Sequence, residues 1–273
     1  MEVNTTDLMN AALRLAGLTA IPVDSDIMVP GKDIKKVLVG VDMDTAEILL
    51  AKELGCDCVV SHHPKNTNAA YADIMDHHID KLVECGVPIN KAQRVLKTQK
   101  EAVALNRHVG NTDRFASAAK LLGMPYMCIH TPADLISEAA VQKVMDEKLG
   151  QNPKAALKDV LDALNEIGEY KKSEVKSEIR CGAEKNFAGK IYVSMSGGTN
   201  GGPEVLKAYF EAGIGTIIQM HATKDDAKAA TDQNIGNLIV TPHMASDSIG
   251  MNVILDEWEK MGVEVVVMSG IVR

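Results

Sequence analysis

The chain has few aromatic residues and no excess of basic ones. Its 273 residues include one Trp, five Tyr and three Phe, and 29 Lys and Arg stand against 37 Asp and Glu, a formal net charge of −8. Proteins that bind nucleic acids usually combine a basic surface that follows the phosphates with aromatic rings that stack on the bases. This composition therefore disfavours DNA or RNA as a partner.

Paired cysteines and long apolar runs are also missing. The odd set of cysteines contains no C-x-x-C pair, so neither a disulfide framework nor a thiolate zinc site is expected. No apolar run approaches the ~18 residues that a membrane span requires. The first residues lack a basic segment and continue as an amphipathic helix, so we expect a cytoplasmic protein without membrane contact.

The order of the remaining patterns predicts an α/β fold. An apolar run at 36–41 precedes a helix expected at 46–54, with Asp44 or Thr45 as its N-cap. CDCVVSHHP then reads as a second buried strand that ends at Pro64. Such a strand, helix and strand favour a parallel sheet.

Two expectations concern the first 33 residues. Thr5, Thr6 and Asp7 offer N-cap chemistry for a helix that ends at Gly17. The stretch from Ile21 to Asp33, which contains Pro, Gly and Asp, is expected to be a loop.

The same pattern returns in the second half of the chain. KIYVSMSGG, PEVLKAYFEAG and GTIIQMHA predict a strand, a helix and a strand, and the apolar stretches before His108 and His243 each lead through an aspartate into a helix. We interpret this as an internal duplication. The predicted segments are a first α/β repeat at 1–124, an intervening helical segment at 125–187 and a second α/β repeat at 188–273.

Histidines and aspartates follow the predicted strands. Ser61-His62-His63-Pro64 ends one of them, and both histidines can serve one site only where the strand gives way to a loop. His243 and Asp247 lie four positions apart at a helix start, and His108 precedes Asp113 at another. The alternatives are an exposed polar strand end for the first group and plain helix capping for the other two.

The carboxyl ends of parallel strands share one rim, where open α/β sheets place ligands. Mixed imidazole and carboxylate groups suit Zn, Fe, Mn or Co rather than Ca or Mg. Five such ligands exceed the need of one structural zinc, so two divalent first-row ions are the expected arrangement. The five predicted ligands are His62, His63, Asp113, His243 and Asp247.

Other polar groups carry weaker signals. The turn that contains Gly197, Gly198 and Gly201 is either a phosphate cradle before a helix or a plain flexible turn. His77 and His78 are expected at the surface, and His130 is expected to be a helix-entry residue. No nucleophile motif of a hydrolase is present.

The stretches KVLVGVDMDTAEILLAKELGCDCVVSHHP, RHVGNTD, IYVSMSGGTNGG with GIGTIIQMHA, and LIVTPHMASDSIG resemble the Nif-three-like family, also called the GTP cyclohydrolase I type 2 family. Several positions depart from its usual pattern. Asp247 stands where the family usually has Glu, and His108 lies five positions before Asp113, where the family's H-T-N-x-D spacing is four. The loop before the first strand lacks W-D-N-x-G-L.

The resemblance implies two intertwined α/β repeats with mixed, largely parallel sheets flanked by helices, and a di-metal site on the five ligands. It also implies a hydrolase in which a metal-activated water acts on a nucleotide; with GTP, attack at C8 would open the ring and release formate. His108 and His221 would then be proton shuttles beside this site. A homo-oligomer, by resemblance a hexamer, is the expected assembly, and the alternative function is a non-catalytic metal-binding interaction or regulatory protein.

Overall fold

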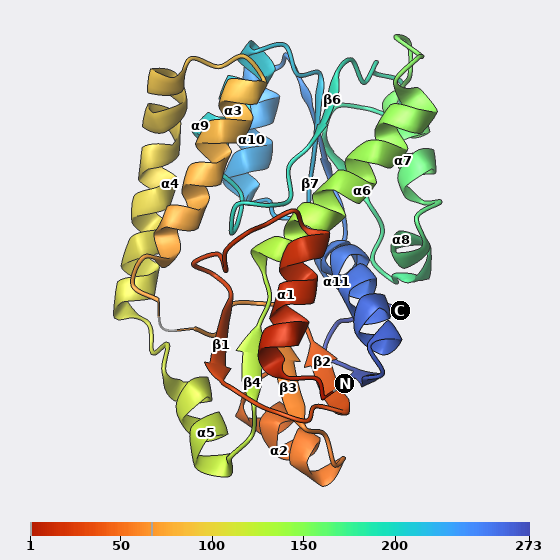
Figure 1. The fold of residues 1–273 in the computed structure, drawn as a ribbon. Coiled ribbons are helices and arrows are strands. Elements are labelled where there is room, and N and C mark those ends of the chain that lie inside the picture. The colour runs from red at the N-terminus through yellow and green to blue at the C-terminus, as the bar shows by residue number, and fades with distance from the viewer. Residues whose placement is uncertain (1, 67) are drawn as a thin grey trace. The chain divides into compact units, whose positions relative to one another are not determined.

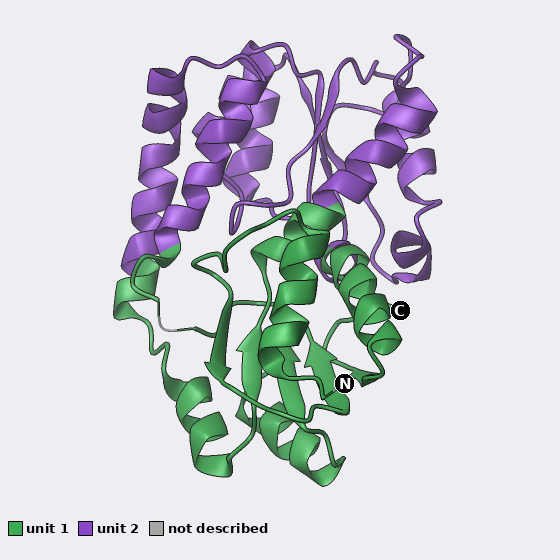
Figure 2. Cartoon of the chain, in the orientation of Figure 1, with its two compact units in different colours: residues 1–71, 106–137, 247–273 green, residues 72–105, 138–246 purple. Residues whose placement is uncertain are grey.

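The structure, a computed structural model, describes residues 2–66 and 68–273 (Figure 1). Two compact units are built from separate stretches of the chain (Figure 2): unit 1 from residues 1–71, 106–137 and 247–273, and unit 2 from residues 72–105 and 138–246. The segments predicted from the sequence follow one another along the chain, whereas each compact unit of the structure combines stretches that are far apart in sequence. No helix in the described residues is long and apolar enough to span a bilayer.

Unit 1 contains a five-stranded sheet of order β1-β4-β3-β2-β9 in which only β1 runs antiparallel to its neighbour. Its strands are β1 (Asp26–Val29), β2 (Lys36–Gly40), β3 (Cys58–Ser61), β4 (Tyr126–Cys128) and β9 (Glu264–Val267). The expected loop from Ile21 to Asp33 is therefore wrong where it covers β1. All four side chains of this edge strand are only half-buried, so it lacks the continuous apolar run that predicts a central strand.

Helices cover both faces of this sheet, which explains the uninterrupted apolar run of β2. Val37 and Val39 pack in one core with Leu8 and Trp258, whereas Leu38 points to the opposite core. The helices concerned are α1 (Thr5–Leu15) and α11 (His243–Lys260) for the first core, and α2 (Thr45–Glu53) and α5 (Arg114–Leu122) for the second.

Local capping determines where the first two helices begin. Asp44 is the N-cap of α2, as predicted, and its backbone N–H donates to Glu47 Oε2 at 2.7 Å. Helix α1 is capped by Asn4, one residue before the predicted positions. The Asn4 side chain accepts from the N–H groups of Thr6 and Asp7.

Unit 2 contains a four-stranded sheet of order β5-β8-β7-β6, again with one antiparallel pair at the edge, β5 with β8. Its strands are β5 (Glu178–Cys181), β6 (Ile191–Val193), β7 (Thr216–Gln219) and β8 (Asn237–Val240). The remaining helical elements of the chain are η1 (Tyr71–Asp76), α3 (His77–Glu84), α4 (Ile89–Val109), α6 (Thr131–Leu149), α7 (Leu157–Leu164), α8 (Gly168–Lys172), α9 (Pro203–Glu211) and α10 (Lys224–Gln233). The predicted α/β class with largely parallel sheets is confirmed.

One predicted strand is wrong. The apolar residues before His108 lie inside the 21-residue helix α4. Ala92, Leu96 and Val103 of this helix pack in the unit 2 core at helical spacing. A short apolar run is compatible with either a strand or a helical turn. Here the helical spacing of apolar residues over the whole segment determines that it is a helix.

Candidate metal centre

His62 and His63 directly follow the end of β3, and their side chains lie close together. The strand stops at Ser61, and the N–H groups of His62 and His63 donate to the carbonyls of Gly40 and Val41 at 2.9 and 2.8 Å. The Ser61 hydroxyl contacts the carbonyl oxygens of Val41 and His63 at 3.1 and 3.0 Å, which holds the turn. Both imidazoles are thus presented from the loop, with ring centroids 5.3 Å apart, as the sequence predicted.

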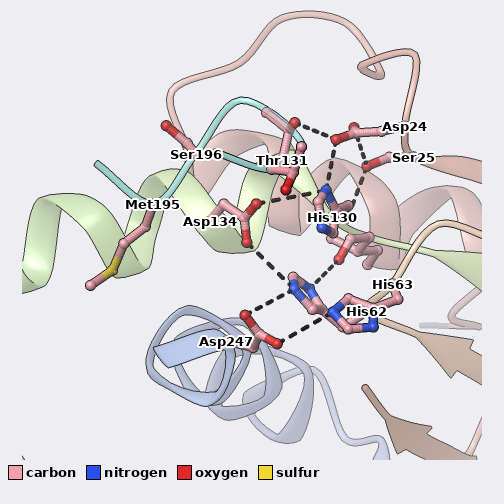
Figure 3. A network of polar contacts seen from close by, with 12 residues as sticks. Asp24, Ser25, His62, His63, His130, Thr131, Asp134, Met195, Ser196 and Asp247 are labelled. Carbon is pink, nitrogen blue, oxygen red and sulfur yellow. Dashed lines mark hydrogen bonds and ion pairs between the residues drawn. The ribbon is translucent and has the colours of Figure 1, made fainter. Parts of the chain in front are cut away.

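His130 joins them from the loop between β4 and α6. Its ring centroid lies 4.8 Å from that of His62 and 6.0 Å from that of His63 (Figure 3). One ligand atom from each of the three rings lies within 4.8 Å of the others. Three imidazoles from two neighbouring strand ends therefore converge.

Each of these imidazoles uses Nδ1 for an oxygen acceptor. Nδ1 of His62 lies 3.0 Å from the Ile129 carbonyl, that of His63 3.0 Å from Asp42 Oδ1, and that of His130 2.8 Å from Asp24 Oδ2. Carbonyl and carboxylate oxygens only accept, so the hydrogen is on Nδ1 in each ring. Nε2 is left as the coordinating atom, the arrangement usual for histidines that bind a metal.

Two buried carboxylates face these rings. His62 Nε2 lies 3.4 Å from Asp134 Oδ1 and 3.5 Å from Asp247 Oδ1, and His63 Nε2 lies 3.6 Å from Asp247 Oδ2 (Figure 3). His62, Asp134 and Asp247 are fully buried. Their ligand atoms also lie within 4.8 Å of one another.

The electrostatics reflect the crowded negative charge. Burial opposes a charge on His62, but the carboxylates of Asp247 and Asp134 raise its pKa well above the ordinary value. Burial likewise opposes a charge on His130, whose pKa is raised by Asp134 and Asp24. Burial alone would raise the pKa of Asp24, yet its bonds to His130 and Thr131 lower it. A cation is therefore favoured between these carboxylates.

The residues present fit a first-row metal ion. Asp134 is fully buried, and neither carboxylate oxygen receives a hydrogen bond from the described residues. A buried carboxylate without donors is costly unless a cation compensates its charge. Imidazole nitrogens and carboxylate oxygens together suit Zn, Fe, Mn or Co.

The sequence contains a signal for His130 and Asp134, which the predicted ligand set does not include. His130-Thr131-Pro132-Ala133-Asp134 follows strand β4 and has the spacing of four that the family pattern H-T-N-x-D has. The expectation that His130 is a helix-entry residue is confirmed, since it lies directly before α6, and its ring is also part of the buried cluster. Asp24 carries no comparable signal, because it lies in an irregular segment.

Asp113 and His108 lie in a different setting. Asp113 is the exposed N-cap residue of α5 and accepts a hydrogen bond from Ser117. His108 is exposed in the last turn of α4. Neither belongs to the groups of closely spaced ligand atoms among the described residues. Their roles as a ligand and a proton shuttle stay predictions.

His243 and Asp247 lie one turn apart at the start of α11, a spacing that places both on one face of this helix. The imidazole of His243 packs edge-on against that of His221, which follows β7, with ring centroids 4.3 Å apart. Ligation by His243 and proton transfer by His221 stay predictions.

The glycine-rich turn of unit 2 packs closely against the chain's own side chains. A Cβ at Gly197 would lie 2.8 Å from His78 Nε2, one at Gly198 2.7 Å from Ile74 Cγ2, and one at Gly201 2.6 Å from Val205 Cγ1. Gly197 and Gly198 also have positive φ angles of 107° and 84°. Packing alone therefore explains these glycines, and anion binding by them stays a prediction.

His78 corrects the expectation that both histidines of this stretch lie at the surface. It is 1% exposed, and its Nε2 donates to the Thr199 carbonyl at 2.7 Å. Burial lowers its pKa to about 3. His77 is half-buried, with Nε2 3.1 Å from Ser196 Oγ. The sequence of α3 is mostly polar, but one face of this helix is buried and contains Lys81 and Leu82 as well as His78.

Comparison with known proteins shows which family shares this fold. No protein-family model and no curated protein matches the chain. A solved structure of a NIF3 superfamily protein from Sphaerobacter thermophilus is 36% identical, with 98% of each chain covered and a TM-score of 0.94. The chain belongs to the NIF3 superfamily. Reduced HcgD from Methanocaldococcus jannaschii shares the fold, at 13% identity, a TM-score of 0.60 and 98% coverage of each chain.

Membership in the NIF3 superfamily confirms the resemblance seen in the sequence. In the sequence itself, residues 130–134 have the spacing of H-T-N-x-D, whereas residues 108–113 are one position too long. Aligned in this way, the pattern ends on Asp134, which lies in the buried cluster.

Proposed function

We propose that this NIF3 superfamily protein is a metal-dependent hydrolase whose centre lies in unit 1. The proposed ligands are His62, His63, His130, Asp134 and Asp247, all of which belong to unit 1. Two divalent first-row ions are the expected content.

One observation carries the proposal. The three imidazoles of unit 1 each have Nδ1 held by an oxygen acceptor, and His62 and His63 direct Nε2 toward buried carboxylates. A histidine that served only packing would not need this shared arrangement. Fixed tautomers and charged oxygens are what a metal centre requires.

The surroundings support a reactive centre rather than a closed structural one. His62, Asp134 and Asp247 are fully buried, but the side chain of His63 remains 22% exposed. A small molecule can therefore approach from the His63 side. A bound first-row ion would act as a Lewis acid and lower the pKa of a coordinated water.

The chain's own residues would orient the ligands and exclude water from most of the site. Asp42 holds the ring of His63 and is itself paired with Lys65, 3.4 Å away. Asp24 and the Ile129 carbonyl hold the other two rings. Several kinds of small substrate are compatible with this arrangement, and a nucleotide is the class that we propose.

Metal analysis of purified wild-type protein and of Asp134→Asn and Asp113→Asn variants tests the site. We expect wild-type protein to hold first-row metal, Asp134→Asn to bind it at least about 100-fold more weakly, and Asp113→Asn to match the wild type. Equal metal content in all three proteins would overturn the ligand assignment. Loss in Asp113→Asn alone would restore the ligand set predicted from the sequence.

A nucleotide screen with the metal-loaded protein tests the reaction. With GTP the expected product is formate, and Asp134→Asn should release none above the background. Metal binding without turnover on any nucleotide would leave a non-catalytic metal-binding protein. Light scattering on the same sample tests the expected homo-oligomer, for which six copies is the predicted number.

A further inference from the structure

Asp24 is a fully buried carboxylate outside the proposed ligand set. It lies between α1 and β1, where its Oδ2 accepts from His130 Nδ1 at 2.8 Å and from the Thr131 hydroxyl at 2.6 Å. Its Oδ1 accepts from Ser25 Oγ at 3.4 Å. All the donors named here belong to residues beside or within the His130 turn.

The backbone that carries Asp24 is held from two sides. The Asn66 side chain donates to the Val23 carbonyl at 2.8 Å, and the Cys128 thiol lies 3.7 Å from the Asp24 carbonyl. Asn66 belongs to the loop after His62 and His63, and Cys128 ends β4. The carboxylate is therefore fixed to the two segments that carry the three imidazoles of unit 1.

Both the backbone and the ring of His130 are held by hydrogen bonds. Its N–H donates to Ser25 Oγ at 3.0 Å, and its ring Nδ1 lies at hydrogen-bond distance from Asp24 Oδ2, 2.8 Å away, and farther, 3.6 Å, from Asp134 Oδ2. A carboxylate has no hydrogen to give, so it accepts only the Nδ1–H form of the ring. An asparagine of the same shape could donate instead and would tolerate the other tautomer.

We propose that Asp24 is a positioning residue that holds His130 as the Nδ1–H tautomer and thereby directs the Nε2 lone pair into the metal centre. The inference rests on the proposed metal binding. It adds a specific reason why a carboxylate, which is costly to bury, stands at position 24. Through this one bond Asp24 sets the affinity of the centre without touching the ion.

Metal affinity and ring tautomer are measured together. Competition for Zn²⁺ with a chromophoric chelator should show Asp24→Asn binding about 10- to 100-fold more weakly than the wild type. Long-range ¹H–¹⁵N correlation spectra of the metal-free protein, recorded at a pH high enough for the His130 ring to be neutral, should show its hydrogen on Nδ1 in the wild type. In Asp24→Asn the spectrum should shift toward Nε2–H.

Asp226→Asn is the matched control, because Asp226 is likewise a buried carboxylate but belongs to unit 2, where it accepts from the Asn200 side chain and the Thr223 N–H. It contacts none of the proposed ligands, so we expect the Zn²⁺ affinity of this variant to stay within about twofold of the wild type. In a His130→Ala background, Asp24→Asn should cause no further loss of Zn²⁺ affinity, since its effect passes through the ring.

Two results would overturn the inference: wild-type His130 with its hydrogen on Nε2, or Asp24→Asn with a Zn²⁺ affinity within about twofold of the wild type. If Asp24→Asn does not fold, the wild-type spectrum alone tests the inference, because a hydrogen on Nε2 of His130 would contradict it. If the wild type binds no metal, the proposed function fails, and the tautomers of the wild type and the variant still decide whether Asp24 positions His130.

Discussion

The first sheet, β1-β4-β3-β2-β9, and the second, β5-β8-β7-β6, share a common four-strand order when β1, β4, β3 and β2 are matched with β5, β8, β7 and β6. Even an irregularity recurs. The antiparallel pair β1 and β4 is interrupted between Ile27 and Val29, and the pair β5 and β8 between Ile179 and Cys181. The repeated topology supports the internal duplication inferred from the sequence.

The strand ends of the two sheets nevertheless carry different chemistry. Ser61 pairs with Cys128, and Gln219 pairs with Val240 at the matching place. His62 and His63 therefore correspond to Met220 and His221. A thioether stands where the first sheet has its most deeply buried imidazole, so the scaffold repeats while the donor set does not. The fold supplies the position, and residue identity decides whether it can bind an ion.

Two acidic residues one turn apart on α6 show the same contrast. Asp134, in unit 1, receives no hydrogen bond from the described residues. Glu138, in unit 2, pairs with Lys81 and accepts from the N–H groups of Met195 and Ser196 at 2.7 and 2.9 Å. Glu138 is therefore neutralised and hydrogen-bonded within the fold, whereas Asp134 is the carboxylate that we propose as a metal ligand.

The largest effect should come from removing the partner of Glu138. Lys81 is 2% exposed, and Lys81→Met leaves the half-buried carboxylate of Glu138 without a cation. We expect the free energy of unfolding, measured with urea, to fall by about 3–5 kcal/mol. Lys143→Met, which breaks an exposed pair with Glu147, should leave stability within experimental error. Similar results for both variants would show that Glu138 is not a structural residue.

The next effect concerns the glycine turn of unit 2. Gly197→Ala forces an L-residue to adopt φ 107° and places Cβ 2.8 Å from His78 Nε2, so we expect a loss of about 3 kcal/mol. Gly17→Ala introduces a positive φ of 71° without a nearby atom, and should cost about 1 kcal/mol. Equal losses in thermal or urea unfolding would argue against close packing of the turn.

The buried His78 should make unit 2 sensitive to acid. Its pKa of about 3 in the folded state lies below the unfolded value of 6.5, so the unfolded state binds more protons between these limits and stability falls as the pH is lowered. Between pH 6.5 and 5 the loss should be about 2 kcal/mol. His78→Gln should remove this part of the pH dependence, measured as the difference between the two proteins; identical pH profiles would contradict it.

The smallest effect is expected at Asp134 in metal-free protein. Asp134→Asn removes one of two buried carboxylates that face His62, which relieves their mutual repulsion, so stability in the presence of a chelator should change by less than about 1 kcal/mol. The same variant should abolish stabilisation by added Zn²⁺. A decrease in the free energy of unfolding as large as that of Lys81→Met would show that Asp134, like Glu138, stabilises the fold.

Much of the first sheet could be predicted from local patterns. The run KVLVG, the capping Asp44 and the strand before His62 correctly predicted β2, α2 and β3, because apolar period and capping act over a few residues. The short edge strand β1 and the helical nature of the stretch before His108 could not be predicted in the same way, since their conformations depend on what they pack against.

The candidate site was predictable in part. The sequence indicates His62, His63 and Asp247 as candidate ligands because each stands at the end of a strand or the start of a helix, and the structure brings them close together. His130 and Asp134 also have a readable spacing, but the predicted ligand set takes its carboxylate from Asp113 instead. Asp24 has no recognisable pattern, because the hydrogen bonds that hold it beside the His130 ring join it to residues 106 and 107 positions away.

By itself the sequence determined the fold class, the family and the kind of ligand atoms available, because apolar period, capping and residue chemistry are local properties. Only the tertiary structure decided which carboxylates meet the histidines, which are neutralised by a lysine and which hold a ring in one tautomer. Those outcomes depend on distances between segments far apart in the chain, and on burial, which makes an uncompensated charge costly.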